Sequence, residues 1–259
     1  MAERPPLAAE AIRVSFAKSD VLTDLSVEIA PATLTVIVGP NGSGKSTLLR
    51  ALARLQPVQA GRVLLGGERI DRQNTRAVAR SLAVLPQGLA APEGISVRDL
   101  VARGRMPHQT PLQQWSAKDA EVVEEVLRRT RLDGLADRKL TALSGGQQQR
   151  VWIAMVLAQD TSLLLLDEPT TYLDMPHQIE LLDLVKSMVG GGKTVVTVLH
   201  DVNLAARFAD RMIAVKTGRI FCDGPPAEVV RADVIEAVFG LACTVIEDPV
   251  HGKPFVIPA

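Results

Sequence analysis

A glycine-rich stretch near the N-terminus carries the residue types best suited to phosphate chemistry. It reads Gly39-Pro40-Asn41-Gly42-Ser43-Gly44-Lys45-Ser46-Thr47 and fits the pattern G-x-x-x-x-G-K-[ST]. Glycines at these spacings let a backbone turn tightly, so that successive N–H groups converge on a chain of phosphates. Lys45 would then reach the β- and γ-phosphates, and the Ser46 hydroxyl would hold Mg²⁺. The stretch therefore predicts a site for a nucleoside triphosphate.

Two carboxylates later in the chain complement this phosphate site. Asp167 and Glu168 end the apolar run Leu163–Leu166, which is typical of a central parallel strand covered on both faces. Ligands of such sheets bind at the carboxyl edge, where these two side chains would lie. We expect Asp167 to orient Mg²⁺ through water. We expect Glu168 to face the γ-phosphate and to act as the general base toward an attacking water.

Three further positions each have a structural and a functional interpretation. The ring of Phe16 could pack in the core or stack on an adenine base. His200 follows the apolar run 194–199, at a strand end where a histidine could be structural or catalytic. Ser144 caps an expected helix, and the two glycines after it leave the start of that helix open to an anion. Because one nucleotide fold does not need two such sites, this second one would face the nucleotide of another copy of the chain.

Short apolar runs separated by glycine, proline and helical segments predict an α/β fold around these residues. We expect strands near residues 12–16, 25–29, 34–38, 63–65, 82–87, 163–166 and 194–199. Residues 88–142 have a helical pattern with S-x-x-D caps at Ser96 and Ser116, which predicts a helical insertion. Inside it, Arg103–Gln109 looks like an exposed loop. The C-terminal part predicts a hairpin at 211–220 and a helix from 226 to about 238.

Length, charge and cysteine content limit the kind of protein. A chain of 259 residues fits one domain or a domain with an insertion. Lys+Arg and Asp+Glu both number 29, so overall charge gives no reason to expect nucleic acid or an anionic membrane surface as a partner. The two cysteines, Cys222 and Cys243, lie far apart and imply no metal site. The N-terminus lacks the apolar core of a signal peptide, and no apolar run approaches the ~20 residues of a membrane span. We expect a cytoplasmic protein whose membrane role, if any, is by docking.

These motifs occur in the order of an ABC-type ATPase cassette, which the sequence resembles over nearly its whole length. The resemblance rests on the glycine-rich stretch, Gln87, Leu143-Ser144-Gly145-Gly146-Gln147, the run that ends in Asp167-Glu168-Pro169, Leu173-Asp174 and His200. It implies an α/β P-loop NTPase (RecA-like) core with an N-terminal antiparallel β-subdomain and an inserted α-helical subdomain. Residues 1–259 would form a single ABC ATPase domain. Residues 1–87 and 143–259 would form the nucleotide-binding core with its β-subdomain, and 88–142 the helical subdomain that docks on a permease.

The resemblance also implies a role for each matched residue. Phe16 matches the aromatic residue that stacks on adenine, and His200 the histidine that contacts the γ-phosphate. Gln87 matches the glutamine that senses Mg²⁺ and the attacking water, and Asp174 the aspartate that crosses the dimer interface. The expected catalytic residues are Glu168, His200 and Gln87, and the expected Mg²⁺ contacts are Ser46, Gln87 and Asp167. The expected ATP-binding residues are Phe16, all nine residues from Gly39 to Thr47, Asp174, and the signature residues Ser144, Gly145, Gly146 and Gln147, which would close on the ATP of the opposite subunit.

A finer resemblance points to one branch of this family. Ala102-Arg103-Gly104-Arg105-Met106-Pro107-His108-Gln109 and Thr170-Thr171-Tyr172-Leu173-Asp174 are similar to segments of the ATPases that power ferric-siderophore importers of the enterobactin and ferric-citrate type. This implies an ATP-hydrolysing subunit with ATP and Mg²⁺ as cofactors. It would work as a head-to-tail ATP-sandwich homodimer on a separate transmembrane permease, at the cytoplasmic face of the bacterial inner membrane, with a substrate-binding protein supplying the cargo.

Other functions stay open at this point. The closest alternative is the same role in haem or cobalamin import, because those ATPases are near relatives. A soluble ABC ATPase acting on nucleic acid or ribosomes usually carries zinc cysteines, paired cassettes or basic extensions, and this sequence has none of them. An exporter's cassette would often be fused to membrane spans. A nucleotide-binding module without turnover would be expected to have degenerate motifs, whereas each motif here is intact.

Overall fold

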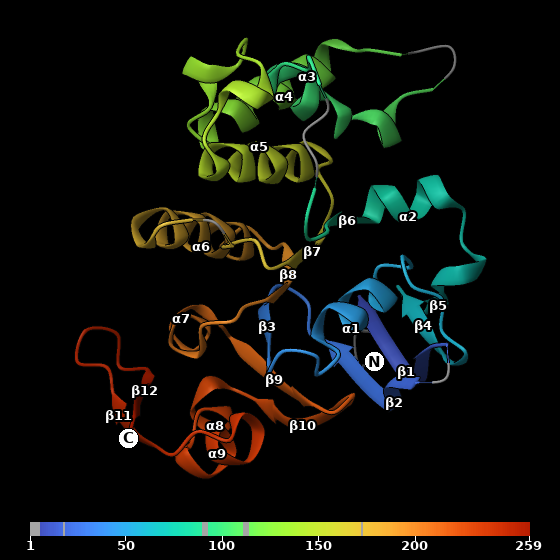
Figure 1. The fold of residues 1–259 in the computed structure, drawn as a ribbon. Coiled ribbons are helices and arrows are strands. Elements are labelled where there is room, and N and C mark those ends of the chain that lie inside the picture. Colours follow the sequence, from blue (N-terminus) through green and yellow to red (C-terminus); the bar gives the residue numbers. More distant parts are fainter. Residues whose placement is uncertain (1–5, 18, 90–92, 111–113, 172) are drawn as a thin grey trace.

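The computed structural model describes residues 6–17, 19–89, 93–110, 114–171 and 173–259. Three sheets organise them: a six-stranded central sheet, a four-stranded antiparallel sheet and a two-stranded hairpin near the C-terminus. A separate group of helices stands beyond the sixth strand of the central sheet, at the far end from the hairpin (Figure 1). The chain therefore has the expected α/β architecture with a β-subdomain and inserted helices.

The central sheet holds the strands that end at the predicted site residues. Its strand order is β10-β9-β3-β8-β7-β6, and all neighbours are parallel except β10 and β9. The strands are β3 (Leu34–Val38), β6 (Leu82–Leu85), β7 (Leu163–Asp167), β8 (Thr194–Val198), β9 (Arg211–Lys216) and β10 (Arg219–Gly224). Every residue of β3, β7 and β8 is buried, which accounts for their apolar sequences. The strands expected here are confirmed, and the hairpin expected at 211–220 is β9–β10.

The antiparallel sheet forms the expected N-terminal β-subdomain. Its order is β2-β1-β4-β5, with β1 at Leu7–Phe16, β2 at Ser19–Ile29, β4 at Ala60–Leu65 and β5 at Glu68–Arg69. Helix α1 (Lys45–Leu52) contacts β1 and β2 of this sheet and β7 and β8 of the central one. Its side chains Leu48, Leu49 and Leu52 are fully buried in a core shared by both sheets. The helix, and the loop in front of it, is thus held from two sides.

Three helices pack together as the inserted part of the fold. They are α3 (Val97–Arg103), α4 (Ala117–Arg129) and α5 (Gly145–Ala158), joined by the 3₁₀ turns η2 (Met106–His108), η3 (Asp133–Leu135) and η4 (Leu140–Ala142). The side chains of Ser96 and Ser116 each accept a hydrogen bond from the backbone N–H three residues later, so both predicted helix starts are confirmed. Helix α5 contacts α3, α4 and β6. It therefore packs with the inserted helices although it lies beyond residue 142 (Figure 1).

The expectation of an exposed loop at Arg103–Gln109 is wrong at Gly104 and Arg105, which are buried. A Cβ on Gly104 would lie 2.2 Å from a backbone oxygen of α5, so only glycine permits this close approach of α3 and α5. Arg105 donates from Nε to Asp119 Oδ1 and from Nη1 to Ala158 O, both at 2.8 Å. Local sequence could not reveal this burial, because the partners lie 14 and 53 residues away.

The remaining helices contact strands of the central sheet, except η1, which contacts β4 of the antiparallel sheet. They are η1 (Ile70–Arg72), α2 (Thr75–Ser81), α6 (Met175–Gly190), α7 (Val202–Phe208), α8 (Pro226–Val229) and α9 (Ala232–Phe239). The single helix expected at 226–238 is two helices, because Arg231 adopts an extended backbone (φ −123°, ψ 149°) and begins α9. Strands β11 (Cys243–Glu247) and β12 (Pro254–Pro258) form the C-terminal hairpin, which packs on α7. Within the described ranges, no helix has the length and apolar character needed to span a membrane.

Candidate functional site

Four neighbouring parallel strands end at one edge of the central sheet, and each leads into predicted site residues. Strand β3 leads into the P-loop (residues 39–47), β6 into Gln87, β7 into Asp167 and Glu168, and β8 into His200. Since β3, β8, β7 and β6 lie side by side in that order, their carboxyl ends meet. The sheet therefore brings together residues that are far apart in the sequence.

Glycines let the P-loop close against the rest of the core. Gly39 has φ 150°, and a Cβ there would lie 2.2 Å from Val215 O. Gly44 has φ 103° immediately before α1, a conformation that favours glycine. Ser43 O accepts a hydrogen bond from Gly218 N at 2.9 Å, so the β9–β10 turn fastens the loop. No side chain in the described part of the chain caps α1, which leaves the N–H groups of its first turn available to an anion. The other predicted ATP-binding residues here lie in the loop or in the first turn of α1: Pro40, Asn41, Gly42, Lys45, Ser46 and Thr47.

The Lys45 ammonium is folded over the P-loop. Its Nζ donates to Gly39 O and Pro40 O, both at 2.9 Å, and the residue is 5% exposed. Burial lowers the pKa of Lys45, while the nearby Glu168 and Asp167 carboxylates oppose that shift. A buried ammonium whose partners are mainly backbone carbonyls is well suited to a ligand that carries several negative charges.

Two of the predicted metal-contacting residues, Ser46 and Asp167, are hydrogen-bonded to each other. Ser46 Oγ donates to Asp167 Oδ1 at 2.8 Å, and the Asp167 side chain is 0% exposed. Its Oδ2 has no hydrogen-bond partner among the described residues, and Arg50 Nε lies 3.7 Å away, an ion pair too long for a hydrogen bond. Burial raises the pKa of Asp167, against the opposing effects of the Ser46 hydrogen bond and the Arg50 charge. A buried carboxylate oxygen that lacks a hydrogen bond and lies beside a serine hydroxyl fits a hydrated Mg²⁺, so Ser46 and Asp167 have the chemistry to hold this ion.

The three predicted catalytic residues are in contact. Gln87 Nε2 donates to Glu168 Oε2 at 2.6 Å, and His200 Nε2 lies 2.7 Å from Glu168 Oε1. Glu168 is 9% exposed and has φ 53°, an uncommon conformation for a residue other than glycine. Thr171 Oγ1 also donates to Oε2, at 3.4 Å. The carboxylate is therefore held in one orientation at the rim of the sheet.

Sequence reasoning missed Arg50 and Thr171, which contact the two carboxylates. Arg50 had a usable signal, because it lies four residues after Ser46 and so on the same face of α1. Thr171 had none, since its contact depends on the shape of the turn after Glu168. The sequence places Gln87 after a strand but does not say where its side chain points. In this structure, its Nε2 donates to Glu168 and not to Asp167.

Phe16 ends β1 and is 49% exposed. It is therefore not a core residue in this chain, although packing in the core was one of its two interpretations. An exposed aromatic ring at the end of a strand is able to stack on a base.

The signature residues and Asp174 lie apart from this group. Ser144 and Gln147 form a capping box at the start of α5, with Gly145 and Gly146 between them, and α5 stands with the inserted helices away from α1 (Figure 1). Asp174 caps α6 and is paired with His177, whose hydrogen bond lowers the pKa of Asp174. Tyr172, part of the finer resemblance, lies outside the described residues. Within one chain, then, the structure does not bring these positions to the P-loop.

Comparison with known proteins shows the family of the chain. The model of the ABC transporter family matches residues 22–171. The chain is 50% identical over 248 residues to the achromobactin transport ATP-binding protein CbrD of Dickeya dadantii (strain 3937), covering 95% of this chain and 92% of the relative. It is 47% identical over 253 residues to the ferric enterobactin transport ATP-binding protein FepC of Escherichia coli (strain K12), covering 97% and 93%. The hemin import ATP-binding protein HmuV of Rhodococcus jostii (strain RHA1) is 41% identical over 253 residues, covering 97% and 86%.

Solved structures give the same picture. An ABC transporter in an inward-facing conformation superposes with a TM-score of 0.84 at 26% identity, covering 98% of this chain and 97% of that one. The dimeric structure of MJ0796, a bacterial ABC transporter cassette, has a TM-score of 0.76 at 26% identity, with coverage of 85% and 98%.

Proposed function

The chain belongs to the ABC transporter family, and we propose that it is the subunit that hydrolyses ATP to power import of a ferric siderophore through a separate membrane permease. The observation that carries the ATPase part is the convergence of Lys45, Ser46, Asp167, Glu168 and His200 at one sheet edge. These residues supply a phosphate cradle, a cation site and a base. The cargo part is supported by relatives of 47–50% identity whose names include achromobactin and ferric enterobactin.

The contacts suggest a role for each residue in hydrolysis. The P-loop N–H groups and Lys45 bind the phosphates, and Phe16 stacks on adenine. Ser46 and Asp167 would hold Mg²⁺, with Gln87 as the third expected contact, and the ion would supply positive charge to balance the phosphates. Glu168 accepts a proton from the attacking water, and His200 orients the γ-phosphate.

The exposed signature residues and Asp174 support a working dimer. Ser144, Gly145, Gly146 and Gln147 form a helix start far from the P-loop of their own chain. In a head-to-tail pair they would close on the ATP bound by the second copy, together with Asp174, so that two ATP molecules lie between the subunits. The MJ0796 cassette, which shares this fold, is also dimeric.

Membership of the family supports the remaining partners. Residues 1–87 and 143–259 act as the nucleotide-binding core, from which helix α5 packs against the inserted helices. The helical subdomain 88–142 docks on the permease at the cytoplasmic face of the bacterial inner membrane. A substrate-binding protein supplies the cargo from outside. Nucleic acid is not a partner in this proposal, in keeping with the formal net charge of zero.

The test is uptake of labelled iron or cobalamin by cells that lack this gene. They receive either the wild-type gene or Glu168→Gln, and are given a panel of ferric siderophores, labelled haem and labelled cobalamin. Loss of one siderophore's uptake, restored only by the wild type, supports the proposal. Selective loss of haem or cobalamin uptake would show that this compound is the cargo instead of a siderophore. Normal uptake of every compound would overturn the import role.

A further inference from the structure

The turn that follows Glu168 is fastened to helix α5. Gln149 Nε2, on α5, donates to Pro169 O at 3.0 Å. Pro169 is the residue immediately after Glu168 and is itself buried. Gln149 thus connects a helix of the inserted group directly to the backbone that carries the expected base.

The geometry of this turn fixes the direction of the Glu168 side chain. Thr171 N donates to Glu168 O at 3.2 Å, and Glu168 takes the left-handed φ of 53°. The other end of the turn is held by Gln178 on α6, whose Nε2 donates to Leu173 O at 3.1 Å. Because a non-glycine residue keeps such a φ only when its surroundings hold it, a shift of the Pro169 carbonyl would be passed to the Glu168 carboxylate.

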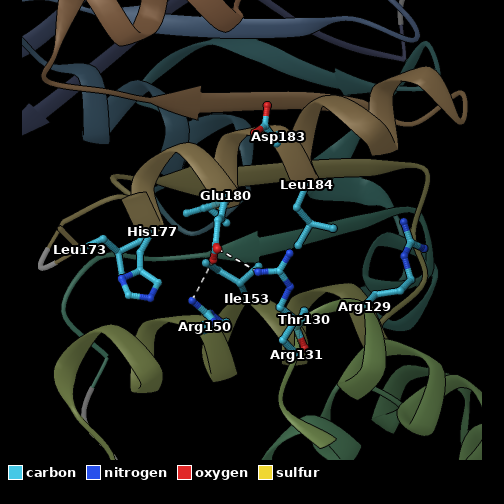
Figure 2. Close-up of a pocket in the computed structure, with 11 residues that line it drawn as sticks. Arg129, Thr130, Arg131, Arg150, Ile153, Leu173, His177, Glu180, Asp183 and Leu184 are labelled. Atoms are coloured by element: carbon cyan, nitrogen blue, oxygen red, sulfur yellow. Dashed lines mark hydrogen bonds and ion pairs between the residues drawn. The ribbon is translucent and has the colours of Figure 1, made fainter. Parts of the chain in front are cut away.

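Gln149 lies on the same rigid helix as the signature. Helix α5 begins at the Ser144 cap, and Gln149 belongs to its first turns. A second tie joins α5 to α6 one residue later, where Arg150 Nη2 lies 3.3 Å from Glu180 Oε2 while Arg131 holds Oε1 (Figure 2). Residues of both helices line a cavity of about 270 Å³ beside these ion pairs. The hydrogen bond from Gln149 is a directed contact that can transmit a movement of α5 to the turn.

We infer that Gln149 is a positioning residue that couples the signature helix to the catalytic carboxylate of its own chain. This inference rests on the proposed dimer, in which the signature contacts the ATP of the second copy. Closure of the signature on that ATP moves α5, and Gln149 carries the movement through Pro169 to Glu168. Each ATP in the sandwich then helps to align the base that acts on the other.

The test uses Gln149→Glu, which keeps the shape of the side chain but removes the N–H donor. Its matched control is Gln148→Glu, the same change one position earlier, where the amide donates to Leu143 O and not to the turn after Glu168. We expect Gln149→Glu to lower kcat about tenfold, as loss of one aligning hydrogen bond would, with KM for ATP within about twofold of wild type. The control should keep kcat within about twofold. An unchanged kcat in Gln149→Glu would overturn the inference.

Mixed dimers test whether Gln149 acts on the Glu168 of its own chain or on that of the second copy. In both mixtures one copy carries Glu168→Gln, so that a single base works. Gln149→Glu is placed either in the copy with the working base or in the other copy, whose signature covers the working ATP. The inference requires the loss in the first mixture and not in the second.

The outcomes separate this inference from the proposed function. Equal loss in both mixtures, or loss only in the second, overturns the inference and leaves the dimer standing. If Glu168→Gln protein stays monomeric with ATP, the proposed dimer fails, and the inference fails with it.

Discussion

His200 Nε2 lies 2.7 Å from Glu168 Oε1, and the two residues follow adjacent parallel strands, β8 and β7. Gln87, after β6, holds the other carboxylate oxygen at 2.6 Å. A carboxylate oxygen has two lone pairs, so Oε1 can accept a hydrogen bond from an attacking water beside its contact with His200. The two neighbours therefore orient the carboxylate without using all of its capacity to act as a base.

Glu168→Gln tests the base. The amide keeps the shape of the carboxylate but cannot accept a proton, so turnover should fall by roughly 10²–10⁴-fold. ATP-dependent dimerisation should persist, because the P-loop and signature are unchanged. Phosphate release and size-exclusion chromatography measure the two properties, with the exposed Glu121→Gln as control. Undiminished phosphate release would remove Glu168 from this role.

Asp167→Asn tests the buried carboxylate. Burial raises the pKa of Asp167, so the carboxylate ionises less readily in the folded protein than in the unfolded chain. The free energy of unfolding therefore decreases as the pH rises through the raised pKa. An asparagine at this position does not ionise, so the variant avoids this decrease in stability. We expect its nucleotide-free melting temperature at pH 7 to exceed that of wild type by about 2–4 °C, which corresponds to ~1 kcal/mol. The difference should narrow as the pH falls.

The same variant should lose most of the extra stabilisation that Mg²⁺ adds to ATP, since a neutral amide is a poor ligand for this ion. Thermal scans with ATP, with and without Mg²⁺, give the measurement. Asp183→Asn, at an exposed position of α6, is the matched control. A melting temperature at pH 7 below that of wild type would contradict the expected effect of burial.

Phe16→Ala tests the aromatic platform. Loss of stacking on adenine should raise KM for ATP about fivefold to tenfold, with kcat nearly unchanged, because the ring is remote from the reacting phosphate. Stability should change by less than about 0.5 kcal/mol, since the side chain is half exposed. Phe16→Tyr should behave as wild type. A large drop in melting temperature with unchanged KM would assign Phe16 to packing instead.

Arg105→Ala tests the tie between α3, α4 and α5. Removing one partner of a buried ion pair leaves Asp119 unpaired, and we expect a loss of about 3–5 kcal/mol in the free energy of unfolding. Arg98→Ala is the control, because its ion pairs with Glu124 of α4 and with Asp137 are exposed and should contribute less than about 1 kcal/mol. Urea unfolding of both variants makes the comparison. Equal losses would show that burial of Arg105 adds nothing to stability.

The sequence predicted most of the site because its signals are local. A glycine-rich loop after an apolar strand, and carboxylates at the end of another, need no knowledge of distant contacts, and parallel pairing then brings Lys45 and Asp167 to one edge. The helix starts at Ser96 and Ser116 were likewise readable from three-residue spacings.

What the sequence could not predict depends on long-range partners. The burial of Arg105 and the tie from Gln149 to Pro169 join elements whose relative placement no periodic pattern encodes. No proline or glycine marks the break between α8 and α9 at Arg231. The backbone there follows the packing of both helices on β9, which the local sequence does not encode. Tertiary contacts decided these three features.

Strand β3 lies between β8 and β9, both of which the ribosome delivers much later. The nascent chain therefore carries the apolar stretch Leu34–Val38 without β8 until residue 198 has emerged and without β9 until residue 216. Gly218, which holds the P-loop, follows at once. Pairing between such distant segments is slow and leaves apolar strand edges exposed in the meantime. Competence to bind nucleotide is thus gained in one late step of synthesis, when the last quarter of the chain completes a site whose first motif was made near the beginning.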